Sequence, residues 1–170
     1  MEKRDLYDIN RNLTGETIYK GEPIPPNKYI VVVLSIIQNS KNKFLIQKRS
    51  LEKDGLYGST GGHPKSGESS LEGIITEIRE EIGLALNPNE LELVYSGRED
   101  NNQVFFDIYY LKKDINISDL ILQKEEVESV EWASIDKIRS LIDNNLFLKN
   151  HAEEFFRVID IFSQRGISII

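Results

Sequence analysis

The sequence predicts an α/β fold in which a mixed β-sheet is packed between helices. Three patterns lead to this prediction: a long apolar, β-branched run at 29–38, an amphipathic helix pattern at 70–81, and a late strand pattern at 127–133 that leads into two further helices. Strands that enclose a helix and are followed by a strand and terminal helices are typical of a sheet with helices on both faces. A chain of 170 residues fits one domain, so we expect residues 1–170 to form a single domain.

Composition and charge restrict the class of function. The chain has no cysteine, which excludes disulfides, thiolate metal sites and a cysteine nucleophile. The formal net charge is −7, whereas proteins that follow an extended nucleic acid usually have an excess of basic residues. No apolar run approaches the roughly 20 residues that span a bilayer, and the charged start Met1–Asp5 leads into no apolar stretch. We therefore expect a cytoplasmic protein with neither a membrane nor an extended nucleic acid as partner.

Seven segments have the β-branched and aromatic content, and the flanking turn residues, of β-strands. The most apolar, Tyr29–Gln38, predicts a central strand covered on both faces. Two hairpins are expected, one across the turn at 39–42 and one across the polar turn at 98–103. A proline-rich break at 21–26 ends an N-terminal strand extension, residues 1–28. The expected strands are 6–10, 16–19, 29–38, 43–48, 91–97, 104–112 and 127–133.

Three helices are expected. The first runs from Ser70 to Glu81, because Ser69 and Glu72 have the spacing of a capping box and Gly83 can end the helix in the left-handed conformation. A second helix is expected near 134–144 and a last one over about 150–164. The last helix has one apolar stripe for the core, which consists of Ala152, Phe155, Phe156, Ile159 and Phe162.

The first helix has two distinct faces. A narrow apolar stripe must face the sheet, and it is formed by Leu71, Ile74, Ile75, Ile78 and Ile82. On a separate face, Glu77, Glu80 and Glu81 lie together at i, i+3 and i+4. Three like charges near a helix C-terminus repel one another and oppose the helix dipole. A divalent cation reverses that balance, because hard Mg²⁺ prefers carboxylate oxygens; the alternative is a solvated acidic helix face.

The residues around this helix resemble the Nudix box: Gly, five residues, Glu, seven residues, Arg-Glu, an aliphatic residue, any residue, Glu-Glu, any residue, Gly and an aliphatic residue. The resemblance lies within residues 61–84, where eight of the nine fixed positions agree. The exception is Thr76, because the family usually has an arginine there that is thought to brace the box carboxylates. The matching residues are Gly62, Glu68, Glu77, Ile78, Glu80, Glu81, Gly83 and Leu84.

The resemblance implies a Nudix-type α/β/α sandwich with a mixed β-sheet, and hydrolysis of the diphosphate bond in a nucleoside diphosphate linked to a group X. It assigns Mg²⁺, or Mn²⁺, to the three helix glutamates and the backbone carbonyl of Gly62. It makes Glu77 the first candidate for the base and Glu126 the second, with Glu126 also a possible further ligand. Glu68 would orient the helix or a water ligand. The partner is then a small-molecule diphosphate, and the N-terminal strands offer a surface for a homodimer. The sequence does not identify X.

Residues outside the box have two interpretations each. Arg49, at the end of a predicted strand, is a candidate for gripping a phosphate of the substrate, or else forms a surface ion pair. Glu126 follows Glu125 in an acidic pair of the kind that is also common as a solvated run. Trp132 is expected to pack in the core, with base stacking as the alternative. His151, at the start of the last helix, is expected to face solvent and is given no role.

The segment around His63 also resembles isopentenyl diphosphate isomerase, a Nudix-fold enzyme with a metal-binding histidine at that place. That isomerase needs a catalytic cysteine two residues earlier, where this chain has Gly61, and further N-terminal histidines, which residues 1–62 lack. Without these groups, the chain has no obvious acid to protonate the alkene of the isomerase substrate. We therefore expect hydrolysis, with two alternatives left open: an isomerase-like enzyme, or a catalytically weak ligand sensor as Thr76 suggests. The likeness is carried by Gly62-His63-Pro64 followed by Gly67-Glu68.

Overall fold

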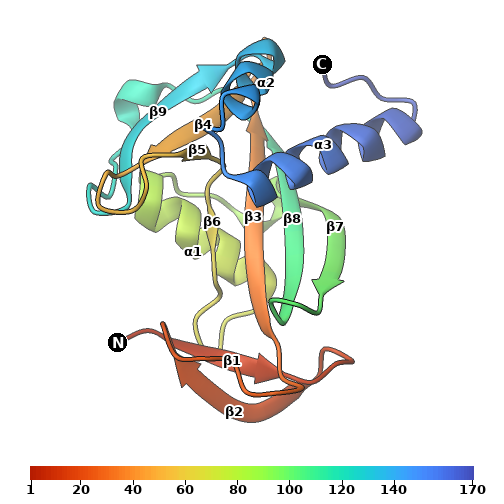
Figure 1. The fold of residues 1–170 in the computed structure, drawn as a ribbon. Helices are drawn as coiled ribbons and strands as arrows, with labels where there is room; N and C mark the ends of the chain where they lie inside the picture. Colours follow the sequence, from red (N-terminus) through yellow and green to blue (C-terminus); the bar gives the residue numbers. More distant parts are fainter.

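The computed structural model describes all 170 residues and shows a mixed β-sheet with helices on both faces (Figure 1). The main sheet has the strand order β5-β4-β3-β8-β7, with β6 paired to β3 and β9 paired to β4, and β1 and β2 form a separate two-stranded sheet. The fold class predicted from the sequence is confirmed. In chain order the elements are β1 (Lys3–Tyr7), β2 (Leu13–Tyr19), β3 (Ile30–Gln38), β4 (Phe44–Arg49), β5 (Tyr57–Gly58), β6 (Gly61–Gly62), α1 (Ser70–Ile82), η1 (Pro88–Glu90), β7 (Glu92–Glu99), β8 (Val104–Lys112), η2 (Ile117–Asp119), β9 (Val127–Ala133), α2 (Ile135–Asp143) and α3 (Lys149–Gln164).

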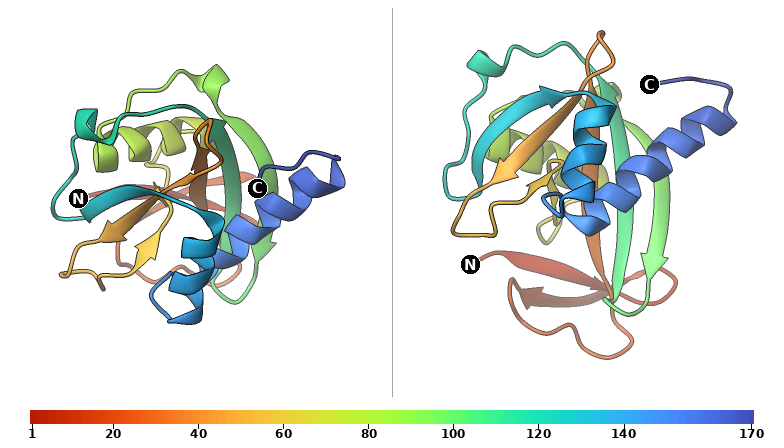
Figure 2. Two further views of the ribbon diagram at one scale, coloured as in Figure 1. Left: turned by 90° about the horizontal axis from the view of Figure 1, so that it is seen from above. Right: turned by 45° about the horizontal axis from the view of Figure 1, so that its top comes forward.

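Strand β3 is the centre of the sheet and is buried on both faces, as its apolar run predicts. Alternate side chains point to opposite faces of a strand. Val33 and Ile37 therefore pack in one cluster with helix α1, whereas Leu34 and Ile36 pack in another with helix α3. Figure 2 shows the same two layers of helix on either side of the sheet. This double burial fixes the position of α1 relative to β3.

Strands β3 and β4 separate directly after the turn that joins them. Gln38 and Phe44 are their one pair of facing residues. Strand β4 then pairs with β9 and β5, while the free edge of β3 is taken by β6 and its other edge by the parallel strand β8. The predicted hairpin is therefore present only at its turn. The divergence leaves a wedge between β3 and β4 into which the segment before α1 fits.

The N-terminal hairpin, formed by β1 and β2, lies across one end of the main sheet (Figure 1). Its buried residues Leu6 and Ile18 pack on Ile30 at the start of β3. The first strand ends at Tyr7, earlier than predicted, because the Asp8 carboxylate accepts hydrogen bonds from later backbone N–H groups and closes a turn. The homodimer expected through these strands stays a prediction.

The C-terminal part confirms the predicted strand at 127–133 and the two helices after it. On α3, Val158 is fully buried in addition to most of the predicted stripe, while Phe156 and Ile159 are only partly buried. Trp132 packs against the apolar cluster under α1 and donates a hydrogen bond from its indole nitrogen to the Ile115 carbonyl at 3.1 Å. It is a core residue, as expected. None of the helices has the length and apolar content needed to cross a membrane.

A buried carboxylate holds the N-terminal hairpin to the rest of the molecule. Asp107 on β8 is 1% exposed. Arg11, from the turn of the hairpin, donates to its Oδ1 at 2.8 Å and Ser96 donates to the same oxygen at 2.7 Å, while Ser70 donates to Oδ2. Burial alone would raise the pKa of Asp107, yet these hydrogen bonds hold it below its ordinary value. The same carboxylate therefore connects the hairpin, the sheet and the first residue of α1.

We predict that Arg11→Met lowers the free energy of unfolding by about 3 kcal/mol, because it leaves a buried charge without its cation. Adding Asp107→Asn to this variant should restore part of the loss, since the charge itself is then removed. Urea unfolding measures both effects. Arg139→Met, at an exposed ion pair, is the matched control and should change the free energy of unfolding by less than about 0.5 kcal/mol. An Arg11→Met variant as stable as this control would contradict the role given to the buried pair.

Candidate active site

Helix α1 is fixed in register by its caps and by its apolar stripe. Ser69 and Glu72 form the predicted capping box, and Gly83 ends the helix in the left-handed conformation with φ 72°. Ile74, Ile78 and Ile82 are completely buried against the sheet. Because helix faces are fixed relative to one another, the three box glutamates then face a cleft of about 420 Å³ beside the sheet.

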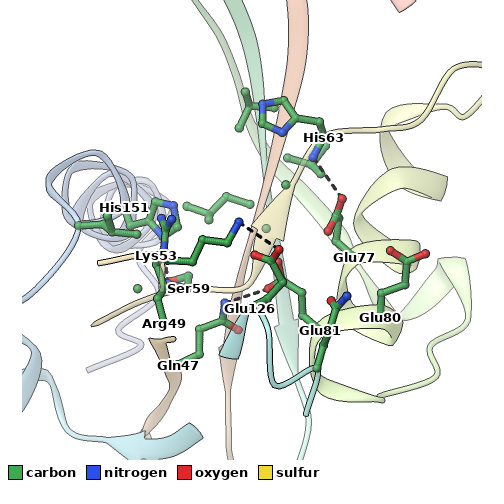
Figure 3. Close-up of a pocket in the computed structure, with 18 of the residues that line it drawn as sticks. Gln47, Arg49, Lys53, Ser59, His63, Glu77, Glu80, Glu81, Glu126 and His151 are labelled. Atoms are coloured by element: carbon green, nitrogen blue, oxygen red, sulfur yellow. Dashed lines mark hydrogen bonds and ion pairs between the residues drawn. The ribbon is translucent and has the colours of Figure 1, made fainter. Parts of the chain in front are cut away.

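The cleft gathers residues from β3, from the β5–β6 segment and from five other parts of the chain (Figure 3). Helix α1 lines one side, and the end of β4 with the loop after it lines the other. The loop before β9, the start of α3 and the N-terminal hairpin complete the wall. Six of the predicted site residues meet here, and the predicted residue Glu68 does not line the cleft. The six are Gly62, Arg49, Glu77, Glu80, Glu81 and Glu126.

The Glu77 carboxylate lies directly against the backbone of Gly62. A Cβ at Gly62 would be 2.4 Å from Glu77 Cδ, so the Glu77 carboxylate would have to move to accommodate it. Glu77 Oε1 also accepts a hydrogen bond from the His63 backbone N–H at 3.3 Å. Glycine at this position therefore lets the Glu77 carboxylate lie directly against the backbone of β6.

The other two box glutamates have different surroundings. Glu81 is buried, and its Oε2 accepts a hydrogen bond from Gln47 Nε2 at 2.9 Å. Gln47 is itself held by Thr60, whose hydroxyl donates to Gln47 Oε1 at 2.8 Å. Glu80 is exposed and forms an ion pair with Lys65. The helix face thus presents two poorly solvated carboxylates and one that is solvated.

Electrostatics at Glu77 and Glu81 are unfavourable for the ionised side chains. Burial, together with the charge of Glu81, raises the pKa of Glu77 to about 8. Burial also raises the pKa of Glu81 to about 7, with the hydrogen bond from Gln47 acting against the shift and the charge of Glu126 adding to it. A cation between these carboxylates would lower the cost of ionising both Glu77 and Glu81.

The donor set fits a hard divalent cation by its chemistry. Carboxylate oxygens and a backbone carbonyl are the ligands that Mg²⁺ prefers. Each box glutamate is engaged with a separate protein donor, and no three acidic or histidine side chains already converge as a ligand cluster. The side chains must therefore turn from these partners to share one ion.

Glu68 and Thr76 form a support behind the cleft. The Thr76 hydroxyl donates to Glu68 Oε2 at 2.6 Å, and the Lys65 backbone N–H donates to Glu68 Oε1 at 2.8 Å. A short hydrogen bond from a hydroxyl to a carboxylate thus connects the two positions at which the family usually has a glutamate and an arginine. Gly73 has a related role, because a Cβ there would lie 2.6 Å from the ring of Pro64. The loop before α1 is therefore packed tightly onto the helix.

Arg49 and Lys53, two cations of the cleft, are already paired with carboxylates. Arg49 Nε lies 3.3 Å from Asp54 Oδ1, and Lys53 Nζ lies 3.1 Å from Glu126 Oε1. Both side chains are about one third exposed and line the cleft, so the ion pair predicted for Arg49 and its place beside a substrate are compatible. Lys53 was not predicted from the sequence, because it lies in a loop without a recognisable pattern.

The expectation for His151 was wrong. Its ring is part-buried in the wall of the cleft, and its Nδ1 accepts a hydrogen bond from the Ser59 backbone N–H at 3.1 Å. No local signal predicts this contact, because the two residues are 92 positions apart. Arg4 and Lys20 of the N-terminal hairpin were also missed. They line the cleft near His63, and burial together with their charges lowers the pKa of His63 to about 4.

We predict that Thr76→Val lowers the free energy of unfolding by about 1 kcal/mol, the usual contribution of one hydrogen bond between side chains. Thr76→Ser keeps the hydroxyl and should be within a few tenths of a kcal/mol of the wild type. Chemical denaturation measures the difference, and Thr17→Val, at an exposed strand position, is the matched control. Equal stability of the Val and Ser variants at position 76 would show that the hydroxyl does not brace Glu68.

We also predict an unusual pH dependence of stability in the metal-free protein. Glu77 and Glu81 hold protons in the folded state up to pH about 8 and 7, far above their ordinary pKa of 4.5, so stability rises as the pH falls through this range. His63 and His151 have pKa values of about 4 in the folded state instead of 6.5, so protonation of the unfolded chain opposes this gain below pH 6.5. Thermal unfolding in EDTA should therefore show stability increasing from about pH 8.5 to 6.5 and levelling off below. An increase in stability from pH 6.5 to 8 would contradict the buried state of the glutamates.

Comparisons with known proteins agree with the fold and with the box. The NUDIX domain family model matches residues 28–157. An uncharacterized Nudix hydrolase of Listeria monocytogenes is 32% identical over 152 residues, which cover 87% of this chain and 89% of that protein. Isopentenyl-diphosphate Delta-isomerase of Escherichia coli is 28% identical over 112 residues, 62% of either chain.

Among solved structures, the Deinococcus radiodurans protein DR0079 has a similar fold, with a TM-score of 0.76 and 22% identity over 92% of this chain and 99% of that one. The family match covers most of the chain and includes every predicted site residue. The chain therefore belongs to the Nudix family of pyrophosphohydrolases.

Proposed function

We propose that this protein is a Mg²⁺-dependent hydrolase that cleaves the diphosphate bond of a nucleoside diphosphate linked to a second group, X. The main support is the meeting of Glu77, Glu80 and Glu81 with two cations, Arg49 and Lys53, around one cleft. Carboxylates suit a divalent metal, and guanidinium and ammonium groups suit phosphate oxygens. An acidic site without these cations would favour metal binding alone.

The proposed roles follow from the surroundings of each side chain. Glu77, Glu80 and Glu81, with the Gly62 carbonyl, would hold the metal. A divalent cation, Mg²⁺ or Mn²⁺, would neutralise the diphosphate and lower the pKa of the attacking water. Glu77 is the first candidate for the base, as the resemblance to the Nudix box implies, and its carboxylate lies at the cleft against the Gly62 backbone. Glu126 is the second.

Arg49 and Lys53 would grip the phosphates. Each can exchange its present carboxylate partner for a phosphate oxygen without leaving the cleft wall. The planar guanidinium of Arg49 can make two parallel hydrogen bonds to one phosphate, whereas Lys53 supplies a single mobile charge. Together they would fix the orientation of the diphosphate relative to the box helix. Glu68 would act indirectly, because its hydrogen bonds hold the loop that carries Gly62 against α1.

The isomerase reaction is the second candidate, and the similarity to the Escherichia coli enzyme favours it. The structure provides an argument against it at the position of the missing cysteine. A Cβ at Gly61 would lie 2.4 Å from the Val33 carbonyl oxygen and 2.9 Å from Leu34 Cδ1. Strand β6 would have to move away from β3 to accept any side chain there. Hydrolysis needs no group at this position.

We predict that Glu80→Gln and Glu81→Gln each lower Mg²⁺-dependent turnover at least tenfold, or about 1.4 kcal/mol of transition-state stabilisation. The amide keeps the size of the side chain but removes the charge that the metal needs. Phosphatase-coupled phosphate release from ADP-ribose, nucleotide sugars and dinucleoside polyphosphates, with Mg²⁺ or Mn²⁺, measures turnover and identifies X. Glu153→Gln, on the exposed side of α3, is the control and should have normal turnover.

Three outcomes would contradict the proposal. Unchanged turnover in both glutamine variants would remove the metal role of the helix. Proton exchange into isopentenyl diphosphate in D₂O, without hydrolysis of any diphosphate, would favour the isomerase. Tight nucleotide binding without any phosphate release would indicate a ligand sensor.

A further inference from the structure

His151 lies in the first turn of α3, on the side of the cleft opposite the box helix (Figure 3). Arg49 is beside it, and Glu77 and Glu80 are across the cleft. His151 therefore faces the box glutamates across the same cleft, within the space that a substituent of a bound diphosphate could enter. None of the roles proposed above uses this side chain.

The ring of His151 is held in one orientation by the loop at β5. Ser59 donates its backbone N–H to Nδ1 at 3.1 Å. The His151 ring also packs closely on Gly58. A Cβ at Gly58 would be 2.6 Å from His151 Nδ1 and 3.0 Å from Leu148 Cδ1. Since Nδ1 accepts a hydrogen bond, the proton of the neutral ring is on Nε2. The backbone thus determines both the place of the ring and its tautomer.

The Nε2–H group is a free donor at the cleft. No acceptor in the protein bonds to it. It is also not sealed in the interior, because the one fully buried side-chain polar atom without a partner is Glu131 Oε1. Burial, strengthened by the charge of Arg49 and opposed by Asp54, lowers the pKa of His151 to about 4, so the ring is neutral at physiological pH. A positioned, neutral donor facing a cleft is suited to binding an uncharged acceptor.

We propose that His151 Nε2 donates a hydrogen bond to an uncharged oxygen or nitrogen atom of the nucleoside, beyond the diphosphate, and that His151 thereby contributes to substrate specificity. The neighbouring Arg49 is far better suited to a charged phosphate, which leaves the neutral donor for a sugar hydroxyl, a ring oxygen or a base acceptor. This inference rests on the proposed function, because it takes the diphosphate to be bound at the box glutamates.

Two variants separate the donor role of Nε2 from the hydrogen bond that Nδ1 accepts from the Ser59 N–H. In His151→Asn the amide oxygen can still accept from the Ser59 N–H, but no donor reaches the position of Nε2. In His151→Gln the longer side chain places an amide N–H near that position. Two non-hydrolysable probes separate the nucleoside from the diphosphate: adenosine 5′-(α,β-methylene)diphosphate and methylenediphosphonate, each titrated calorimetrically with excess Mg²⁺.

The expected result is specific to one probe. His151→Asn should weaken binding of the nucleotide probe about tenfold, which corresponds to the loss of one hydrogen bond, and leave methylenediphosphonate binding within twofold of the wild type. His151→Gln should recover most of the nucleotide affinity. In wild-type protein, the ¹⁵N resonance of His151 Nε2 should shift on addition of the nucleotide probe and not on addition of methylenediphosphonate, a measurement that needs no variant.

The contrary results are distinct. Unchanged nucleotide affinity in His151→Asn, equal weakening of both probes, or no recovery in His151→Gln would each overturn the role of Nε2 and leave the proposed function intact. The same holds if the Nε2 resonance is indifferent to the nucleotide. If the wild-type protein binds neither probe with Mg²⁺, the proposed function fails, and this inference fails with it.

Discussion

The close approach of the Glu77 carboxylate to the backbone of Gly62 is the contact on which the rest of the site depends. It requires a position without Cβ on β6, and it requires β6 to pair with β3. That pairing is possible only because β4 leaves the edge of β3 after the first facing pair. Helix α1, the loop before it and the centre of the sheet are thus brought together at one point. The favourable packing of three buried isoleucines offsets the cost of placing a carboxylate there.

Local patterns in the sequence were sufficient to predict the box helix and its carboxylates. Capping residues, a terminal glycine and a 3.6-residue apolar period are all properties of one short segment, so the helix has nearly the predicted ends. The spacing of Glu77, Glu80 and Glu81 on that helix then follows from geometry. The five strands predicted for the main sheet are all present, because Val, Ile and aromatic residues mark strands whatever their partners are. The two-residue strands β5 and β6 were not predicted, because they lie in a glycine-rich segment without a strand pattern.

Non-local contacts could not be predicted in this way. A strand pattern does not say which strand it pairs with, so the separation of β3 and β4 and the pairing of β4 with β9 were not foreseen. His151 was misjudged for the same reason, since the loop that holds it is far away in the chain. The hydrogen bond from the Thr76 hydroxyl to the Glu68 carboxylate was not foreseen either, and the weaker activity expected from the missing arginine stays a prediction.

The ion pairs within and around the cleft have a consequence for the order in which ligands bind. Lys65 is paired with Glu80 and Lys53 with Glu126, so two of the carboxylates at the cleft have a cationic partner before any ligand arrives. A metal ion bound by Glu80 would displace Lys65, and a phosphate bound by Lys53 would displace Glu126. If both ligands bind as proposed, the metal would take these carboxylates and the phosphates would take the lysines, so each ligand would remove a cost that the other meets. Thermodynamic linkage makes this coupling reciprocal. If the proposed function holds, these two ion pairs would therefore favour the metal–diphosphate complex over either component alone.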